Sequence, residues 1–314
     1  MPGNNAISPQ TINHFIGARN IVDRVKNALD AMWNVGNGAV FPHTLLLGPA
    51  GVGKTEMANI IAREMGVPLI ETLGNAIVLQ SDLNALLLQA EGGCLFIDEA
   101  HTLFSDHQVT LLKVLQEGRI FLDSSDPSTK TFLDLKPFCL LAATTDEWAL
   151  SRPMVDRFRL ILRFDYYSTE EMTLLVSRRA KAMNWELADG VAEVIASRSK
   201  GTPRIGIRLL ENCVRTAQAQ SETVITPAIL SRTCNLEQLD SRGLDAIEQK
   251  YLRLLGEAGG TVRVNVIASC LGLPRQTLER AIEPFLIRER LIEKSESGRV
   301  LTALGARHLE QSTS

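Results

Sequence analysis

The sequence predicts an α/β protein in three consecutive parts: a parallel-sheet domain, a small helical domain and a winged helix. The first part follows from the string GPAGVGKT at residues 48–55, which separates a short apolar run from an amphipathic segment. It also follows from the apolar run 94–97, which ends in two carboxylates. The winged helix follows from three helical patterns and a hairpin pattern after Gly243.

Composition favours a soluble protein of two or three domains. The 314 residues are 45% hydrophobic and 22% charged, and no apolar run is long enough to span a bilayer. The start of the chain lacks the features of a signal peptide. The five cysteines form no Cys-x-x-Cys pair, which argues against zinc and disulfides and favours the reducing cytoplasm. Because the formal net charge is −3, nucleic-acid binding must rest on local basic patches.

The glycine-rich string predicts a phosphate-binding loop. An apolar strand pattern (43–47) precedes it, and a helical pattern (56–65) that stops at Gly66 follows it. Glycines let several backbone N–H groups point at an anion, and the helix N-terminus adds partial positive charge. Lys54 is placed to reach phosphate oxygens, and the Thr55 hydroxyl is placed to bind Mg²⁺. The alternative is a glycine-rich turn that binds nothing.

Two carboxylates follow the apolar run 94–97. Asp98 and Glu99 come at the carboxyl end of a predicted buried parallel strand, where functional groups of α/β sheets gather. Beside a phosphate loop, Asp98 is expected to support Mg²⁺ and Glu99 to orient and deprotonate an attacking water. The alternative is an ordinary strand end with two solvated acids.

Other elements of the first domain are predicted from periodicity. Residues 1–14 are expected to form a loose arm. Helices are predicted over 20–33, 81–89 and 108–116, and strands over 67–73, 138–143 and 160–164. The runs 119–122 and 130–133 flank a polar, proline-containing tip and predict a β-hairpin. Its apolar residues Ile120, Leu122, Phe132 and Leu133 fit either a core face or an exposed patch for a partner.

The rest of the chain is predicted to be mainly helical. Residues 168–235 have helical patterns that begin with the capping box Ser168–Glu171. Leu244, Ile247, Tyr251 and Leu255 mark a first helix of the winged helix, and 264–271 and 274–288 mark two more. The runs 291–294 and 299–301 then form the wing. The arginines and lysines of the winged helix fit either phosphate contacts or a solvated helix face balanced by glutamates.

These motifs, in this order, resemble the AAA+ ATPases and, among them, the RuvB family of Holliday-junction branch-migration motors. The resemblance extends over nearly the whole chain. The matching pieces are Phe15–Gly17, Gly48–Thr55, Leu95–His101, Asp134–Phe138, Ala142–Thr145, Asp156–Phe158, Gly201–Arg204, Arg208–Leu210, Glu283–Ile287 and Gly298–Val300. It implies an AAA+ P-loop domain at 1–166, a helical lid at 167–238 and a winged-helix DNA-binding domain at 239–314.

The resemblance also implies residue roles. Thr145 matches the sensor 1 threonine, Arg204 matches sensor 2, and Arg157 matches the arginine finger that completes a neighbouring subunit's site. In the family's wing, Arg299 is expected to contact the DNA backbone. The residues expected to bind ATP are Phe15, Ile16, Gly48, Gly51, Val52, Gly53, Lys54, Thr55, Glu56, Asp98, Pro203 and Arg204, with Thr55 and Asp98 also holding Mg²⁺.

The implied function is ATP-driven branch migration. By resemblance, six copies form a ring on duplex DNA at four-way junctions in recombination and repair. A RuvA-like junction-binding protein is expected to dock on the hairpin 119–133, and a RuvC-like resolvase is a further expected partner. The sequence departs from the family at the hairpin tip, which is Asp123–Pro127 rather than glycine-rich, and at Arg159, where glycine is usual.

Two other functions fit the same ATPase. A protein-remodelling AAA+ machine would carry aromatic pore loops and would show no salt-sensitive DNA affinity. An ATP-switched winged-helix regulator would read base edges and discriminate strongly between sequences, whereas a motor should show little discrimination.

Overall fold

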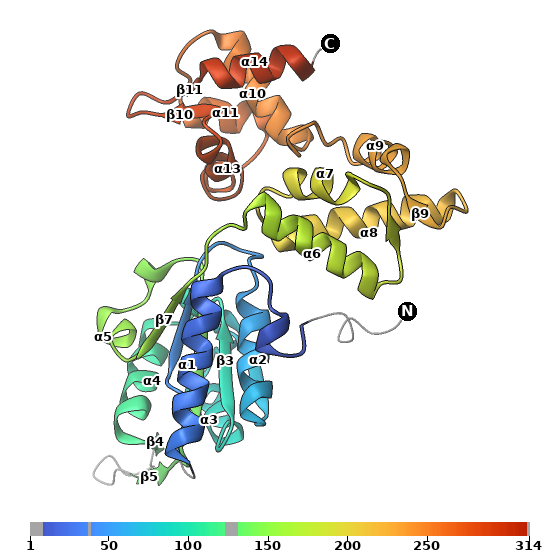
Figure 1. The fold of residues 1–314 in the computed structure, drawn as a ribbon. Coiled ribbons are helices and arrows are strands. Elements are labelled where there is room, and N and C mark those ends of the chain that lie inside the picture. Colours follow the sequence, from blue (N-terminus) through green and yellow to red (C-terminus); the bar gives the residue numbers. More distant parts are fainter. Residues whose placement is uncertain (1–8, 37–38, 123–130, 313–314) are drawn as a thin grey trace. The chain divides into compact units, whose positions relative to one another are not determined.

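A computed structural model describes residues 9–36, 39–122 and 131–312 of the chain (Figure 1). The described residues fall into two compact units. The first contains residues up to Glu171 together with Thr202–Arg204, and the second contains Met172–Gly201 and the chain from Ile205 onward. Among the described residues, no helix has the length and apolar character needed to cross a membrane.

The first unit is built on a five-stranded parallel sheet with the strand order β2-β3-β6-β1-β7. The strands are β1 (Thr44–Leu47), β2 (Leu69–Leu73), β3 (Cys94–Asp98), β6 (Cys139–Thr144) and β7 (Leu160–Arg163). The central strands are continuous apolar runs because both faces of the sheet are covered by helices. The predicted parallel-sheet domain is confirmed.

Alternation along the strands divides the core between the two faces. Leu45, Leu95 and Leu140 belong to one apolar cluster with residues of α3 (Gln80–Gln89), α4 (Ser105–Glu117) and α5 (Arg152–Val155). Their neighbours Leu46, Phe96 and Leu141 are also fully buried and point to the other face. There α1 (Arg19–Val35) and α2 (Lys54–Met65) lie over the sheet (Figure 1).

The first residues of the described chain are anchored. Residues 9–14 were predicted to belong to a loose arm, and this is wrong for them. Ile12, in the short 3₁₀ helix Ile12–His14, is buried, and its N–H donates to Glu64 Oε1 on α2 at 2.8 Å. One buried apolar side chain and one charge-assisted hydrogen bond hold the segment to α2. Residues 1–8 of the predicted arm lie outside the described part.

The predicted β-hairpin is present as β4 (Arg119–Leu122) paired antiparallel with β5 (Thr131–Asp134). Ile120 is fully buried in the sheet core, whereas Phe132 and Leu133, on opposite faces of β5, are about half exposed. The Arg119 guanidinium lies 4.7 Å from the centre of the Phe132 ring. The predicted core position therefore holds for Ile120, and a partner on the exposed residues stays a prediction. The tip at 123–130 and the Leu122 side chain lie outside the described part.

The lid consists of α6 (Thr169–Ala182), α7 (Val191–Arg198), α8 (Pro203–Ala219) and α9 (Pro227–Leu236). A parallel pair of two-residue strands, β8 (Glu186–Leu187) and β9 (Val224–Ile225), was not predicted. The predicted capping box is confirmed: Ser168 N–H donates to Glu171 Oε2 at 3.0 Å, and Glu171 N–H donates to Ser168 Oγ at 3.2 Å.

The winged helix contains α10 (Ala246–Ala258), α11 (Val264–Leu271), a third helical stretch and the wing strands β10 (Ile292–Lys294) and β11 (Arg299–Leu301). The third helix, predicted over 274–288, is confirmed as a continuous helical stretch over 275–288, but it is not α-helical throughout. The stretch consists of α12 (Arg275–Thr277), a π-helical turn (Leu278–Ile282) and α13 (Glu283–Arg288). Pro284 lacks an N–H and cannot continue an α-helical ladder, which explains the π-helical turn. A further helix, α14 (Ala303–Ser312), was not predicted.

Lid and winged helix are tied together within the second unit at Lys200. Its ammonium pairs with the buried Glu248 carboxylate and lies 5.0 Å from the centre of the Phe285 ring. Its backbone carbonyl accepts a hydrogen bond from Arg288 Nη2 at 2.7 Å. A second tie is the buried pair between His308 Nε2 and Asp240 Oδ2 at 2.8 Å. These contacts join the segment after α7 to both α10 and α13.

Candidate active site

The glycine-rich loop, Asp98 and Thr145 lie at the carboxyl edge of three neighbouring strands, β3, β6 and β1. The glycine-rich loop leaves β1 at Gly48, whose N–H donates to Thr144 O at the end of β6 at 3.3 Å. Asp98 ends β3, the strand beside β6. The parallel sheet therefore brings segments that are far apart in sequence to one edge, where α/β proteins bind ligands.

The loop backbone has the conformation that its glycines allow. Gly51 and Gly53 have φ of +80° and +102°, values that side chains other than glycine rarely adopt. At Gly48 a Cβ atom would lie 2.5 Å from the carbonyl oxygen of Phe164, so a side chain has no room there. The loop leads directly into α2, so N–H groups of the loop and of the helix N-terminus form one anion-binding surface.

Lys54 is a buried cation held by neutral groups. Its side chain is only 6% exposed, and Nζ donates to the carbonyl oxygens of Gly48 at 2.7 Å and Pro49 at 2.8 Å. Burial lowers the pKa of the ammonium, and the nearby carboxylates of Glu99 and Asp98 oppose that shift. Within the described residues it forms no salt bridge, so its charge is left for an anionic ligand.

Thr55 and the acid pair are in contact. Thr55 Oγ1 donates to Asp98 Oδ2 at 3.1 Å, and Asp98 Oδ1 accepts the N–H of Glu99 at 2.9 Å. The described residues contain no cluster of three or more His, Cys, Asp or Glu side chains that could hold a metal ion. One hydroxyl and one carboxylate are the few protein ligands that Mg²⁺ uses when phosphate oxygens and waters complete its shell. The donor set therefore fits Mg²⁺ delivered with a nucleotide.

Glu99 has an unusual backbone conformation. Its φ of 48° and ψ of 46° lie in the left-handed region, which non-glycine residues adopt rarely and at some cost. Its carbonyl oxygen accepts from Thr102 N and Thr102 Oγ1, both at 2.8 Å. Gly74 packs against the same carbonyl, where a Cβ atom would be 2.7 Å from Glu99 O. The strained turn is thus fixed from two sides.

The two threonines after β6 differ in exposure. Thr145 is exposed at the strand end, one residue beyond the carbonyl that binds Gly48 N–H. Thr144 is fully buried, and its hydroxyl lies 3.0 Å from His101 Nδ1 and 3.1 Å from Asp146 O. Thr145 is therefore the hydroxyl that can meet a ligand, and Thr144 is internal.

The segment Thr202–Arg204 groups with the P-loop unit although the lid flanks it on both sides. Arg204 N–H donates to Gly51 O at 3.3 Å, and a Cβ atom on Gly51 would lie 2.9 Å from Arg204 Cβ. Pro203 is buried, whereas the Arg204 side chain is exposed beside the loop. Arg157 is exposed after α5, in the segment that leads to β7.

Aromatic residues line the loop on one side. The Phe15 ring would lie 3.2 Å from a Cβ atom on Gly53, and Ile16 beside it is half-buried. Sequence reasoning missed Tyr167, which packs on Gly17, lies close to Gly53 and is mostly buried. Burial raises the pKa of its phenol, so the hydroxyl stays protonated. A tyrosine just past the last strand of the sheet carried no motif signal.

The remaining predicted ligands lie on the loop and on α2. Val52 is fully buried at the loop apex, and Glu56 is half-buried in the first turn of α2. Neither position conflicts with nucleotide binding.

Arg299 does not lie where a DNA contact requires. Its side chain is 4% exposed, and it donates to Glu283 at 3.0 and 2.9 Å and to Glu279 at 3.1 Å. Glu283 also accepts from the buried Tyr251 hydroxyl at 3.0 Å. The prediction that Arg299 contacts the DNA backbone is therefore corrected: the arginine is an internal ion-pair partner. The carboxylates come from the third helical stretch of the winged helix, so the strand pattern alone could not show this.

Other basic residues of the winged helix also have acidic neighbours. Arg275 donates twice to Glu279 at 3.1 Å, Lys294 lies 3.9 Å from Glu279, and Arg288 lies 3.7 Å from Glu289. The expectation of a solvated face balanced by glutamates holds for these three.

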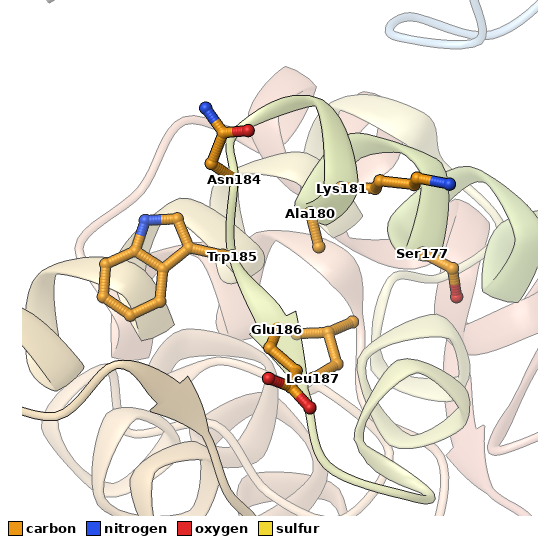
Figure 2. Close-up of a pocket in the computed structure, with 7 residues that line it drawn as sticks. All are labelled: Ser177, Ala180, Lys181, Asn184, Trp185, Glu186 and Leu187. Carbon is orange, nitrogen blue, oxygen red and sulfur yellow. The ribbon is translucent and has the colours of Figure 1, made fainter.

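A shallow hollow in the lid has a different character (Figure 2). Residues of α6 and β8 and of the turn between them line it, including Ala180, Lys181, Asn184 and Trp185. The amide of Asn184 and the amine of Lys181 extend in opposite directions, and Trp185 lies to one side of β8 (Figure 2). Polar groups do not converge on it as they do at the glycine-rich loop.

A phosphate loop, an acid pair on the neighbouring strand, a helical lid and a winged helix define the class as an AAA+ P-loop ATPase. Comparison with known families specifies it further. The family model for the Holliday junction DNA helicase RuvB P-loop domain matches residues 7–164. The RuvB AAA lid domain matches 167–240, and the RuvB C-terminal winged helix domain matches 241–310.

Individual relatives agree. The Holliday junction branch migration complex subunit RuvB of Thermotoga petrophila is 35% identical over 97% of this chain and 92% of its own length. The Kosmotoga olearia subunit of the same name is 35% identical over 96% and 90%. The solved structure of the Thermotoga maritima RuvB Holliday junction branch migration motor has a TM-score of 0.84 at 33% identity, covering 97% of this chain and 98% of that one. The chain belongs to the RuvB family.

Proposed function

We propose that the protein is an ATP-driven motor that moves duplex DNA through Holliday junctions during recombination and repair. Lys54 carries the proposal. It is a buried ammonium without a carboxylate partner among the described residues, at the N-terminus of α2 and beside an acid pair. Such a site is built for a triphosphate rather than for the stability of the apo fold.

The residues divide the chemistry among them. Lys54 and the loop N–H groups bind the phosphates, while Thr55 and Asp98 hold Mg²⁺. When bound, the metal neutralises charge that develops on the phosphate oxygens. Glu99 orients an attacking water and accepts its proton. Thr145 and Arg204 contact the γ-phosphate from the end of β6 and from the start of α8.

Arg157 acts on a neighbouring copy. Its exposed position after α5 supports a role in trans, in which it stabilises charge on the phosphoryl group held by the next subunit. Phe15, Ile16 and Pro203 form walls of the adenine site. This arrangement requires a ring, and six subunits are the expected number by family resemblance.

The hairpin carries exposed apolar side chains that could bind a partner protein at junctions. Phe132 and Leu133 are 50% and 44% exposed on β5, which is unusual for large apolar side chains on a short strand. We assign the exposed apolar side chains of this hairpin to a RuvA-like junction-binding protein, with a RuvC-like resolvase acting in the same assembly in the cytoplasm. DNA is gripped through its phosphates, largely without regard to sequence.

The test is ATP hydrolysis with and without duplex DNA at two salt concentrations. Wild type, Glu99→Gln and the exposed control Glu117→Gln are compared. Stimulation by DNA that fades with salt, and that is lost only in Glu99→Gln, supports a motor that grips phosphates. Hydrolysis that ignores DNA would favour a protein remodeller, and strong dependence on DNA sequence would favour a regulator. Absence of hydrolysis in wild type would overturn the proposal.

A further inference from the structure

His101 connects two strand ends in the candidate active site. It lies in the short 3₁₀ turn Ala100–Thr102 that follows the acid pair. Its Nδ1 atom is 3.0 Å from Thr144 Oγ1 at the end of β6 and 3.3 Å from Glu99 Oε2 at the end of β3. The proposed roles of the P-loop residues make no use of this histidine.

The hydrogen-bond pattern of Thr144 determines which nitrogen of His101 carries a proton. The hydroxyl accepts from Asp146 N–H at 3.0 Å and lies 3.1 Å from the carbonyl oxygen of Asp146, which can only accept. The single hydroxyl proton therefore goes to that carbonyl, and Thr144 Oγ1 accepts from His101. If Nδ1 had no proton, its lone pair would also face the Glu99 carboxylate at 3.3 Å. Both arguments give an Nδ1–H tautomer.

Glu99 needs such a donor. Its Oε2 atom is screened from solvent and makes no regular hydrogen bond with the described residues, although the side chain as a whole is 40% exposed. A screened carboxylate oxygen without a partner is unfavourable, and His101 Nδ1–H is in closest reach. Rotation of either side chain by a small amount would convert the 3.3 Å approach into a hydrogen bond.

We propose that His101 is a positioning residue for ATP hydrolysis. Its Nδ1–H holds Glu99 Oε2 and leaves the other carboxylate oxygen for the attacking water. The same proton is shared with Thr144, which is covalently joined to Thr145, so a shift at the end of β6 changes how firmly Glu99 is held. The inference rests on the proposed role of Glu99.

The test compares four variants of the full-length protein at saturating and limiting ATP. His101→Asn places an amide N–H near the position of Nδ1, whereas His101→Gln places the same amide near Nε2. His101→Ala and His101→Phe remove the donor, and the phenyl ring keeps the volume of a side chain that is 21% exposed. Wild type and Glu99→Gln are measured beside them. Fluorescent nucleotide binding and thermal melting are recorded for every protein.

We expect His101→Ala and His101→Phe to lower kcat about 10- to 100-fold, as removal of an orienting partner does. KM for ATP and nucleotide affinity should change less than about 2-fold, because the histidine does not touch bound phosphates in this scheme. His101→Asn should recover most of kcat and His101→Gln should not. If the alanine variant melts early, the Asn and Gln pair decides the question, since both carry the same amide and one methylene group changes where its N–H lies.

Three results would overturn the inference: wild-type kcat in both His101→Ala and His101→Phe, equal activities of His101→Asn and His101→Gln, or a loss confined to KM. An inactive wild type would instead defeat the proposed function, and the inference with it. If wild type is active and Glu99→Gln is inactive, the proposed function stands, and the four His101 variants then test the histidine alone.

Discussion

Lys54 and Arg299 are two buried cations with opposite surroundings. Lys54 is 6% exposed and is held by two carbonyl oxygens. Arg299 is 4% exposed and is held by the carboxylates of Glu283 and Glu279. Burial lowers the pKa of the lysine, whereas the hydrogen bonds that the arginine donates to Glu283 raise its pKa.

The difference separates a binding group from a structural one. A buried charge is expensive unless an oppositely charged group pairs with it, so a buried cation without an ion pair, such as Lys54, suits a ligand that supplies the anion. Arg299 already has its anions and can offer little to DNA. Burial alone is therefore uninformative about function, and the identity of the partner is what distinguishes the two sites.

The largest expected effect is on activity, at Lys54. Lys54→Met keeps much of the volume and removes the charge. ATP hydrolysis should fall at least about 10²- to 10³-fold, as when a preorganised charge at a reacting centre is lost. The free energy of unfolding should be unchanged or higher, because a desolvated ammonium is removed. Hydrolysis assays and urea denaturation measure the two quantities, with exposed Lys113→Met as the control. Activity within 3-fold of wild type would contradict the comparison.

The next effect is on stability, at Arg299. Arg299→Met leaves Glu283 buried without its cation and should lower the free energy of unfolding by about 3–5 kcal/mol. Urea denaturation measures the loss, and Arg280→Met, an exposed arginine in the same domain, should stay within about 0.5 kcal/mol of wild type. The double variant Arg299→Met/Glu283→Leu should recover part of the loss, since both charges leave together. A lone Arg299→Met that is fully stable but loses DNA affinity would restore the contact role.

His43 extends the comparison to a half-buried side chain whose charged form is disfavoured. Its Nδ1 accepts from Leu140 N–H at 3.0 Å, and burial together with nearby Arg159 lowers its pKa below the usual 6.5. Below that pH the unfolded chain binds a proton that the folded chain does not, so stability falls as pH drops from 6.5 toward the folded pKa. The slope is at most about 1.4 kcal/mol per pH unit.

Urea denaturation of wild type and His43→Gln between pH 7.5 and 5.5 checks this, with exposed His14→Gln as the control. The His43 variant should lose that part of the slope, and His14→Gln should keep it. Equal slopes in all three proteins would show that His43 binds protons equally in the folded and unfolded chains.

The smallest expected effect is at a partly exposed pair. Arg163 donates to both oxygens of Glu147, at 2.6 and 3.0 Å, and the two side chains are 62% and 24% exposed. Glu147→Gln should cost less than about 1 kcal/mol, and the cost should shrink at high salt. Glu283→Gln is the same chemical change at the buried pair and should cost several times more. Equal costs would mean that geometry, rather than burial, sets the strength of these pairs.

The sequence predicted well those parts that depend on neighbours along the chain. The loop from Gly48 to Thr55 is local, and the strand before it and the helix after it place Lys54 without reference to distant residues. Continuous apolar runs such as Cys94–Ile97 likewise identify buried parallel strands. The acid pair followed from the same logic, since carboxyl ends of parallel strands share one edge.

The predictions were wrong where a residue far away in the chain determines the contacts of a side chain. Arg299 was predicted to contact DNA because it lies in the wing, but it binds Glu283, 16 residues away. His101 gained its contact from Thr144, 43 residues away, and no spacing rule reports that pairing. The helical periodicity of 274–288 predicted the helix correctly, whereas the π-helical turn before Glu283 depends on Pro284 and is not visible in the periodicity.

Lys200 lies one residue before the chain passes from the second unit to the P-loop unit, between Gly201 and Thr202. Its ammonium and its carbonyl are both held by the winged helix, through Glu248 and Arg288. Two different groups of one residue, its ammonium and its carbonyl, thus fix the end of this segment to two helices of the winged helix, α10 and α13.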